Sequence, residues 1–297
     1  MTCNICLSKL TSYATKEGFD HYRCNSCGHI QVFPMPTIED LKQYYSKDYV
    51  FTDCEGLDTK VKSVPPTLSF IQSYFQNFYG AKCLDVGAGN GRFLNELRGM
   101  GFSELYAIEP NESLVTHLID SGFIVEKGMV SKDSFAKLSF DVINAGDVIE
   151  HIIDPVSFMQ SIRSKLNVGG LLIITTPNIH SHWSRFTFFL YRYLSIPWSS
   201  LTPIAHVNNF SLVSLRHLLN ANSFQIVDSY FSPPGLKYEL GHTHLFRSFR
   251  EDKNLKNLLF WVFGWSLYVI SFYSLKLFCK RGPTDFKMTL IAQIIPD

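Results

Sequence analysis

The residues whose chemistry is easiest to recognise are four cysteines near the start of the chain. Cys3 and Cys6 form one Cys-x-x-Cys pair, and Cys24 and Cys27 form another. Two such pairs around a short hairpin are typical of one tetrahedral zinc site, in which the metal replaces a core too small to fold alone. A redox dithiol or unligated thiols are the alternatives. The spacing predicts a structural Zn²⁺ held by all four cysteines.

A second candidate site is the glycine-rich turn at residues 83–91, Cys-Leu-Asp-Val-Gly-Ala-Gly-Asn-Gly. An apolar strand that ends in Gly-x-Gly-x-Gly and leads into a helix lets the backbone approach a ligand, and the helix start offers unpaired N–H groups. The dinucleotide spacing Gly-x-Gly-x-x-Gly fails, because the third glycine is Gly91 and Arg92 follows. Asp85 instead favours S-adenosylmethionine (SAM), because a carboxylate at the end of the strand can hold the cationic methionine part of that cofactor. An ordinary strand-to-helix turn is the structural alternative.

A carboxylate follows this turn at the distance that a nucleoside ligand requires. Glu109 ends the next apolar run, residues 105–108, about twenty residues beyond the glycines. A carboxylate at this place can accept hydrogen bonds from two ribose hydroxyls. The alternative is a solvated charge at the end of a strand. Asp85 and Glu109 together favour SAM as the ligand.

The best candidate for chemistry lies further along the chain. Asp147, Glu150 and His151 place three ionisable side chains within five residues, directly after the apolar run 140–145. Open α/β sheets bind their ligands at this end of a strand. His151 is a candidate general base, and His206 is a second one from a later segment. Alternatively, Glu150 and His151 form a hydrogen-bonded pair that only shapes the turn.

These residues need a scaffold of alternating strands and helices to position them. Asn111 is predicted to cap a helix that ends at Gly122, Asp154 to cap the next, and Ser211 a later one. A further helix is predicted at residues 67–79. The predicted strands are residues 83–86, 105–108, 123–125, 140–145, 171–175, 224–231 and 288–295. The alternation predicts an α/β fold.

The composition limits the classes of function. The chain has 297 residues, 46% of them hydrophobic, which suits one α/β domain with appendages. The formal net charge of +1 predicts no general attraction to nucleic acid or to an anionic membrane. Met1 leads directly to Cys3 without the basic and apolar regions of a secretory signal, so the seven cysteines indicate a reducing, cytoplasmic setting.

Taken together, the motifs resemble the class I SAM-dependent methyltransferases, and more narrowly the bacterial group that joins an N-terminal zinc ribbon to that fold. The resemblance covers residues 1–232 and the last strand. Each motif alone is weak, but the set is specific. The residues that carry it are Cys24-x-x-Cys27-Gly28 with Pro34-x-Pro36-Thr37, Leu84-Asp85-Val86-Gly87-x-Gly89-x-Gly91, Ile108-Glu109-Pro110, Phe140-Asp141-Val142-Ile143 with Asp147-Val148-Ile149-Glu150-His151, and Thr176-Pro177-Asn178.

The resemblance implies a fold and a division of the chain. The fold is a Rossmann-like seven-stranded sheet whose last strand is antiparallel. We expect a zinc ribbon at residues 1–32, a helical connector and linker at 33–66, and the methyltransferase domain at 67–297. Within that domain an aromatic cap is expected at 179–210 and an apolar helical insert at 233–285.

The same resemblance implies which residues bind SAM. Asp85 and the glycine turn would line the methionine part, Glu109 would bind the ribose, and Met129 would border the adenine. The sulfonium would lie near residues 146–147. The cofactor-binding residues implied in this way are Asp85, Gly87, Ala88, Gly89, Gly91, Glu109, Pro110, Met129, Gly146 and Asp147.

Two related groups of methyltransferases imply a further metal site. The quinone-pathway O-methyltransferases and the small-RNA terminal 2′-O-methyltransferases use an acidic-x-x-Glu-His motif and a later histidine around a divalent metal. Asp147, Glu150, His151 and His206 match that pattern here. The resemblance therefore implies a second, divalent metal that would orient an acceptor hydroxyl.

The apolar insert has a membrane-like composition at residues 257–275, which carry no charge and are rich in Trp, Phe and Tyr. The stretch is long enough for a span, but a single crossing would place two strands of one sheet on opposite sides of the bilayer. It is therefore either an interfacial helix, with Lys276, Lys280 and Arg281 at headgroup level, or a helix buried against the cap or a partner subunit. The interfacial interpretation is favoured, because nearly all faces are apolar and Trp and Tyr are frequent.

The sequence therefore predicts an enzyme, a SAM-dependent methyltransferase. We expect it to methylate oxygen, rather than carbon or nitrogen, of a small metabolite, a glycan or a lipid-linked acceptor. The expected location is the cytoplasm, peripheral to the inner face of the membrane. The alternatives are a non-catalytic SAM-fold scaffold and an RNA methyltransferase. The latter lacks the basic surface that phosphate binding requires, so no nucleic-acid partner is expected.

Overall fold

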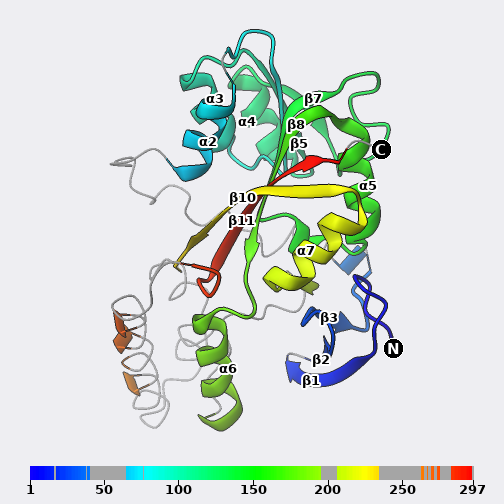
Figure 1. Cartoon of the computed structure of the whole chain (residues 1–297), viewed down its shortest axis with the longest axis vertical. Helices are drawn as coiled ribbons and strands as arrows, with labels where there is room; N and C mark the ends of the chain where they lie inside the picture. The colour runs from blue at the N-terminus through cyan, green and yellow to red at the C-terminus, as the bar shows by residue number, and fades with distance from the viewer. Residues whose placement is uncertain are drawn as a thin grey trace.

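The computed structural model (Figure 1) describes most of the chain. The described residues are 1–16, 18–37, 39–40, 65–75, 77–194, 206–233 and 282–295, with 262, 263, 266, 269, 270, 273 and 274. Most of the expected connector at 33–66 and of the expected insert at 233–285 lies outside them. Among the described residues, no helix is both long and apolar enough to cross a membrane.

A seven-stranded sheet forms the centre of the molecule, in the order β10-β11-β8-β7-β4-β5-β6. The inner strands β4 to β8 pair in parallel, whereas β11 runs antiparallel to both β10 and β8. This confirms the Rossmann-like sheet with an antiparallel last strand. The strands are β4 (Lys82–Val86), β5 (Glu104–Glu109), β6 (Ile124–Lys127), β7 (Phe140–Gly146), β8 (Leu166–Pro177), β10 (Phe224–Ser232) and β11 (Lys287–Ile294).

Helices follow the strands in alternation, and three of them begin at the predicted capping residues. Asn111, Asp154 and Ser211 each accept backbone N–H groups of the first turn on the side chain, which satisfies donors that have no partner within the helix. Among the described residues, the helices are α2 (Pro66–Tyr74), α3 (Arg92–Gly99), α4 (Glu112–Asp120), α5 (Pro155–Lys165), α6 (His182–Leu194) and α7 (Leu212–Ala221), and η1 (Ile149–His151) is a 3₁₀ turn.

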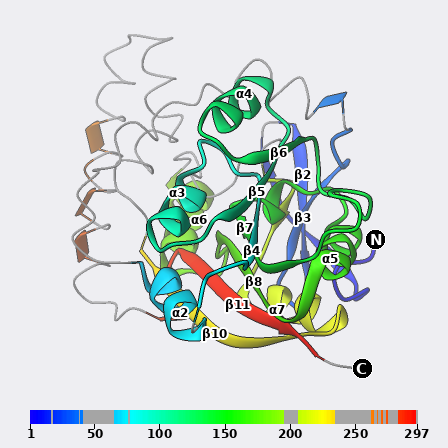
Figure 2. The ribbon, with the colours of Figure 1, turned by 90° about the horizontal axis from the view of Figure 1, so that it is seen from above.

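The helices cover both faces of the sheet, so the sheet is buried on each side (Figure 2). Apolar residues of α2, α3 and α4 pack with one set of strand residues, for example Leu94 and Leu97 with Cys83 and Val142. Residues of α5 and α7 pack on the other face. Two buried faces explain why these strands read as continuous apolar runs rather than as alternating ones.

A second, smaller sheet lies at one end of the large sheet, next to α6 (Figure 1). Its order is β1-β2-β3-β9, from β1 (Leu10–Lys16), β2 (Phe19–Cys24), β3 (Ile30–Phe33) and β9 (Asn208–Asn209). The first three strands come from the expected zinc ribbon, but β9 comes from the expected cap. Cys3, Ile5 and Leu10 of this ribbon join the same core cluster as α5 and α7.

The ribbon also packs against α6. The ring of Tyr13 stacks on that of Phe188 with centroids 4.7 Å apart, and the Tyr191 hydroxyl donates to the Thr15 carbonyl at 2.5 Å. The expected aromatic cap therefore contains α6, and part of the apolar surface of this helix is buried against the ribbon.

Two predicted boundaries differ from the observed ones by five residues, and the other strand boundaries differ by less. The helix predicted at residues 67–79 ends at Tyr74, because Phe75 is extended (φ −93°, ψ 119°). Phe75 and Phe78 still reach the core, where both rings contact Phe102. Their apolar spacing therefore continues the helical pattern although both residues lie beyond the end of the helix. Strand β8 starts at Leu166 instead of residue 171, and the β7–β8 register shifts between Phe140 and Val142.

Candidate functional site

The glycine turn between β4 and α3 requires glycine for its backbone. Gly87, Gly89 and Gly91 have φ angles of 68°, 56° and 75°, in the left-handed region that other residues adopt only with strain. A Cβ atom on Gly87 would lie 2.6 Å from Val148 Cγ2. The turn is therefore in close contact with the segment that follows β7, which carries Glu150 and His151.

Packing against neighbouring side chains explains why residue 91 is a glycine. It is the residue before α3, and a Cβ there would lie 2.7 Å from Leu118 Cδ2 and 2.9 Å from Phe123 Cε2. These contacts are with α4 and the residue before β6 rather than with an open cavity. The third glycine of the motif thus lets two elements of the fold approach each other.

Asp85 lies at the end of β4 and is 3% exposed. Burial raises the pKa of its carboxyl to about 7, the hydrogen bond from Asn144 opposes this, and the charge of Glu109 adds to it. Asn144 Nδ2 donates to Asp85 Oδ1 at 2.7 Å. Sequence reasoning did not give Asn144 a role, but the pairing of β4 with β7 places it directly opposite Asp85.

Glu109 ends β5 beside the glycine turn. Its Oε2 accepts from the Gly89 N–H at 3.0 Å, and its Oε1 accepts from the Asn111 N–H at 2.9 Å. Burial raises the pKa of this carboxyl, while the two backbone hydrogen bonds oppose the rise. A carboxylate can accept about four hydrogen bonds, so two acceptor positions remain for the hydroxyls of a ribose.

The other expected cofactor residues form the rim of this region. Pro110 follows Glu109 and is exposed, and Met129 is 60% exposed. Asp147 has a positive φ of 54° and forms an ion pair with Lys287 of β11, with Oδ2 and Nζ 2.5 Å apart. Burial acts to lower the pKa of Lys287, but the charges of Asp147 and Glu150 outweigh it and the pKa is raised. Lys287 was not among the predicted site residues.

Three of the four predicted metal-site residues come together. One ligand atom each of Glu150, His151 and His206 lies within 4.8 Å of the others, and the two imidazole rings have centroids 5.0 Å apart. We call this group the Glu-His-His cluster. Asp147 lies outside it, paired with Lys287, so the expected four-residue arrangement is reduced to three residues.

Glu150 is the buried member of the cluster, at 2% exposure. Its Oε2 accepts from the Thr176 hydroxyl at 2.9 Å, whereas its Oε1 has no hydrogen-bond partner among the described residues. Burial raises the pKa of Glu150 to about 8, and the charge of Asp147 adds to the rise. A buried carboxyl oxygen without a partner is rare in folded proteins, and such groups occur at catalytic and ion-binding sites. The small pocket beside it is lined by Glu150, Thr176, Pro177, Ile179, Ser184, His206, Asn208 and Asn209.

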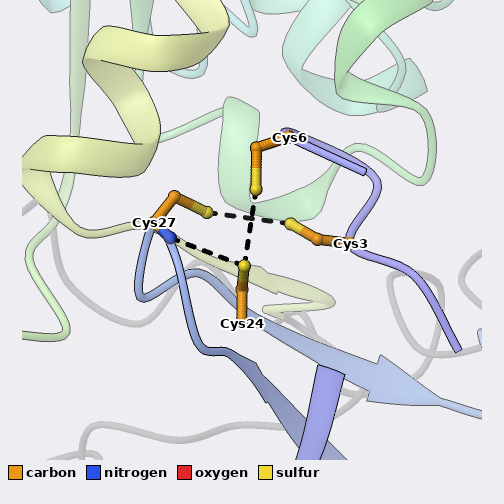
Figure 3. A group of neighbouring side chains, drawn as sticks. All are labelled: Cys3, Cys6, Cys24 and Cys27. Carbon is orange, nitrogen blue, oxygen red and sulfur yellow. Dashed lines mark hydrogen bonds between the residues drawn. The ribbon is translucent and has the colours of Figure 1, made fainter. Parts of the chain in front are cut away.

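The four cysteines converge as the zinc prediction requires (Figure 3). Cys3 Sγ lies 3.7 Å from Cys27 Sγ, and Cys6 Sγ lies 3.4 Å from Cys24 Sγ. Zn–S bonds of about 2.3 Å in a tetrahedron place two sulfurs about 3.8 Å apart. Backbone N–H groups of Ile5 and Cys27 point at the sulfurs of Cys3 and Cys24.

The protonation of this cluster also suits a metal. The hydrogen bond from Cys27 lowers the pKa of Cys3 to about 4, and the same contact raises the pKa of Cys27, because the pair shares a proton. Zn²⁺ binds cysteines as thiolates, so a metal ion would replace the protons of this buried group of four sulfurs. The four residues fit a structural Zn²⁺.

A family model for the methyltransferase domain matches residues 62–229 of this chain. The chain belongs to this methyltransferase family. Among curated proteins, the methyltransferase resembles the ubiquinone biosynthesis O-methyltransferase of Actinobacillus pleuropneumoniae serotype 7, with 30% identity over 125 residues, covering 38% of this chain and 53% of the relative. The enzyme of the same name from Xanthomonas euvesicatoria is 28% identical over 134 residues, covering 42% and 55%.

Solved structures agree on the fold. The YcgJ protein of Bacillus subtilis superimposes with a TM-score of 0.50 and 15% identity, covering 78% of the methyltransferase and 98% of that chain. At this identity the likeness concerns the fold alone. The methyltransferase spans about half the length of the curated relatives it matches.

Proposed function

We propose that this methyltransferase transfers the methyl group of SAM to a hydroxyl oxygen of an acceptor held beside the Glu-His-His cluster. The observation that carries the proposal is the position of Glu150. Its buried Oε1 has no hydrogen-bond partner among the described residues, and a carboxylate oxygen of Glu150 lies within 4.8 Å of a ring nitrogen of His151 and of His206. Glu150 follows β7 in the segment whose Val148 lies close to Gly87 of the glycine turn. The candidate donor and acceptor sites are therefore neighbours.

The residues divide into two tasks. Asp85 and the glycine turn would bind the methionine part of SAM, and Glu109 would bind its ribose. SAM supplies an already activated methyl group, so the protein mainly aligns the acceptor oxygen with it. His151 would take the hydroxyl proton as general base.

The cluster also fits a divalent metal ion. A carboxylate oxygen without a partner and two imidazoles are donors that such an ion accepts. Glu150, His151 and His206 would hold it, and when bound it would orient the acceptor hydroxyl and favour loss of its proton.

The proposed class of acceptor follows from the curated relatives and from the surface of α6. The curated relatives act, by their names, in ubiquinone biosynthesis as O-methyltransferases. By analogy with these relatives, we propose oxygen as the acceptor atom. The acceptor would be a small metabolite, a glycan or a lipid-linked molecule at the inner face of the membrane. The exposed rings of Phe189 (51%) and Tyr193 (71%) on α6 support contact with an apolar surface.

The proposal is tested with SAM labelled in its methyl group. Purified protein is incubated with extract of the source cells, separated into membrane and aqueous fractions, and the labelled product is identified. We expect label on an oxygen of a molecule in the membrane fraction, and less when His151 is replaced by Gln. Binding of SAM without any labelled product would favour the scaffold alternative, and label on RNA would favour the RNA-methyltransferase alternative.

A further inference from the structure

Asn208 occupies a buried position between the zinc ribbon and the Glu-His-His cluster. It lies in β9 and is 0% exposed. Its Oδ1 contacts Asn4 Nδ2 and His29 Nε2, each at 2.9 Å, and its Nδ2 donates to the Ile152 carbonyl at 2.6 Å. An amide oxygen only accepts, so His29 donates from Nε2. One side chain thus joins three segments of the chain.

Two of these partners belong to the cysteine knuckles. Asn4 lies between Cys3 and Cys6, and His29 follows Cys27 by two residues. The Ser211 hydroxyl adds a further link, because it donates to the Cys27 carbonyl at 2.7 Å. The metal-binding end of the ribbon therefore holds the Asn208 amide from one side.

The third partner belongs to the candidate acceptor site. Ile152 is the residue that ends η1, the turn that carries Glu150 and His151. His206 precedes Asn208 by two residues in the same segment. Asn208 therefore fixes the backbone on both sides of the cluster.

We infer that Asn208 is a positioning residue through which the zinc ribbon sets the arrangement of Glu150, His151 and His206. The inference rests on the proposed function only for the role of that cluster. Removing a buried amide with three hydrogen bonds leaves its partners unsatisfied, so the segments it joins must rearrange. No hydrogen bond links Asn208 to the described residues of the glycine turn, so SAM binding is expected to be independent of it.

The test uses the full-length, zinc-loaded protein with the substitutions Asn208→Ala and Asn208→Asp. The Asp variant keeps an acceptor for Asn4 and His29 but turns an oxygen toward the Ile152 carbonyl. We follow the ring resonances of His151 and His206 by NMR, assigned with His→Gln variants. Both resonances should shift in each variant, while the SAM affinity measured by calorimetry stays within about twofold, as for sites without shared partners.

Matched variants separate positioning from general destabilisation. Asn4→Ala removes only the contact from the ribbon, and it should produce a smaller shift of both resonances. If Asn208→Ala does not fold, Asn4→Ala becomes the variant that decides the test. Asn25→Ala, an exposed asparagine of the same ribbon, should leave both resonances in place. Loss of the Zn²⁺ in Cys6→Ser, which leaves any divalent metal at the Glu-His-His cluster in place, should move the same two resonances.

Three results would overturn the inference. They are unmoved histidine resonances after zinc removal, unmoved resonances in both Asn208→Asp and Asn4→Ala, or a loss of SAM affinity that accompanies every shift. The proposed function is judged separately, by the labelled product. Shifted resonances without any methylated product would support the coupling and reject the proposed function.

Discussion

The two halves of the candidate site are built in different ways. The SAM half uses residues of adjacent strand-turn-helix units, with Asp85, the glycine turn and Glu109 within one short stretch of chain. The acceptor half combines η1 with His206, Asn208 and the ribbon, whose Asn4 is 204 residues away from Asn208. The comparison shows that the cofactor region depends on local structure, whereas the acceptor region depends on long-range docking.

The largest effect should come from the acceptor half. His151→Gln is expected to reduce methyl transfer about 10²- to 10⁴-fold, because a positioned general base contributes about that much. The measurement is the rate of label transfer from SAM at saturating cofactor. His117→Gln, on the exposed side of α4, serves as the control. If the rate is unchanged in His151→Gln and also after a chelator has removed any metal, Glu150 and His151 have only a structural role.

The next effect should come from the SAM half. Gly87→Ala is expected to weaken SAM binding about 100-fold, because the residue has a positive φ and its Cβ would meet Val148 at 2.6 Å. Gly80→Ala is the matched control, since Gly80 has a φ of 75° with nothing within 4 Å of its Cβ position. Calorimetric titration with SAM measures both. Equal losses in the two variants would show that backbone strain alone, rather than the contact with Val148, explains the effect.

The effect of pH on SAM affinity should be smaller than the effect of Gly87→Ala. Burial holds the pKa of Asp85 at about 7, and only the charged carboxylate attracts the cationic cofactor. The affinity should therefore rise with pH up to about 7 and fall by at most about tenfold per unit below it. Binding near this pH should release protons, which calorimetry detects in buffers of different ionisation enthalpy. Asn144→Ala should move the curve to higher pH, because the Asn144 hydrogen bond lowers the pKa of Asp85.

The smallest effect concerns stability. The pKa of Glu150 is about 8 in the folded protein, against an ordinary value of 4.5. Between these two pH values the folded state keeps a proton on Glu150 that the unfolded state has lost. The free energy of unfolding should fall as pH rises through this range, by at most about 1.4 kcal/mol per unit from this group. Glu150→Gln resembles the protonated acid and should flatten this dependence, as measured by denaturant titration at several pH values. A slope unchanged in this variant would assign the dependence to other groups.

The same contrast explains what the sequence could predict. Asp85, the glycine turn and Glu109 were recognisable because a strand, its turn and the next helix are adjacent in the chain. The helix caps at Asn111, Asp154 and Ser211 were correct for the same reason. The four cysteines also converge, since their spacing around one hairpin leaves little freedom.

Long-range contacts were not predictable in this way. Asn144, Thr176 and Lys287 support the site from neighbouring strands, and their roles depend on strand register, which a single sequence does not fix. Asp147 matched the metal motif by spacing, but its positive φ and its ion pair with Lys287 keep it out of the cluster. Strand β9 has two residues, too few for any periodicity to indicate it.

The fourth strand of the ribbon has a consequence for how the protein matures. During synthesis, at about 5–20 residues per second, the cysteine knuckles emerge first, and β9 follows about 180 residues later. Pairing of Ile30 with Asn209 closes a loop of most of the chain, and such distant contacts form slowly. The glycine turn and its partners Asn144 and Val148 all precede β9 in the chain. A newly made chain should therefore acquire the ability to bind SAM before its acceptor site is complete.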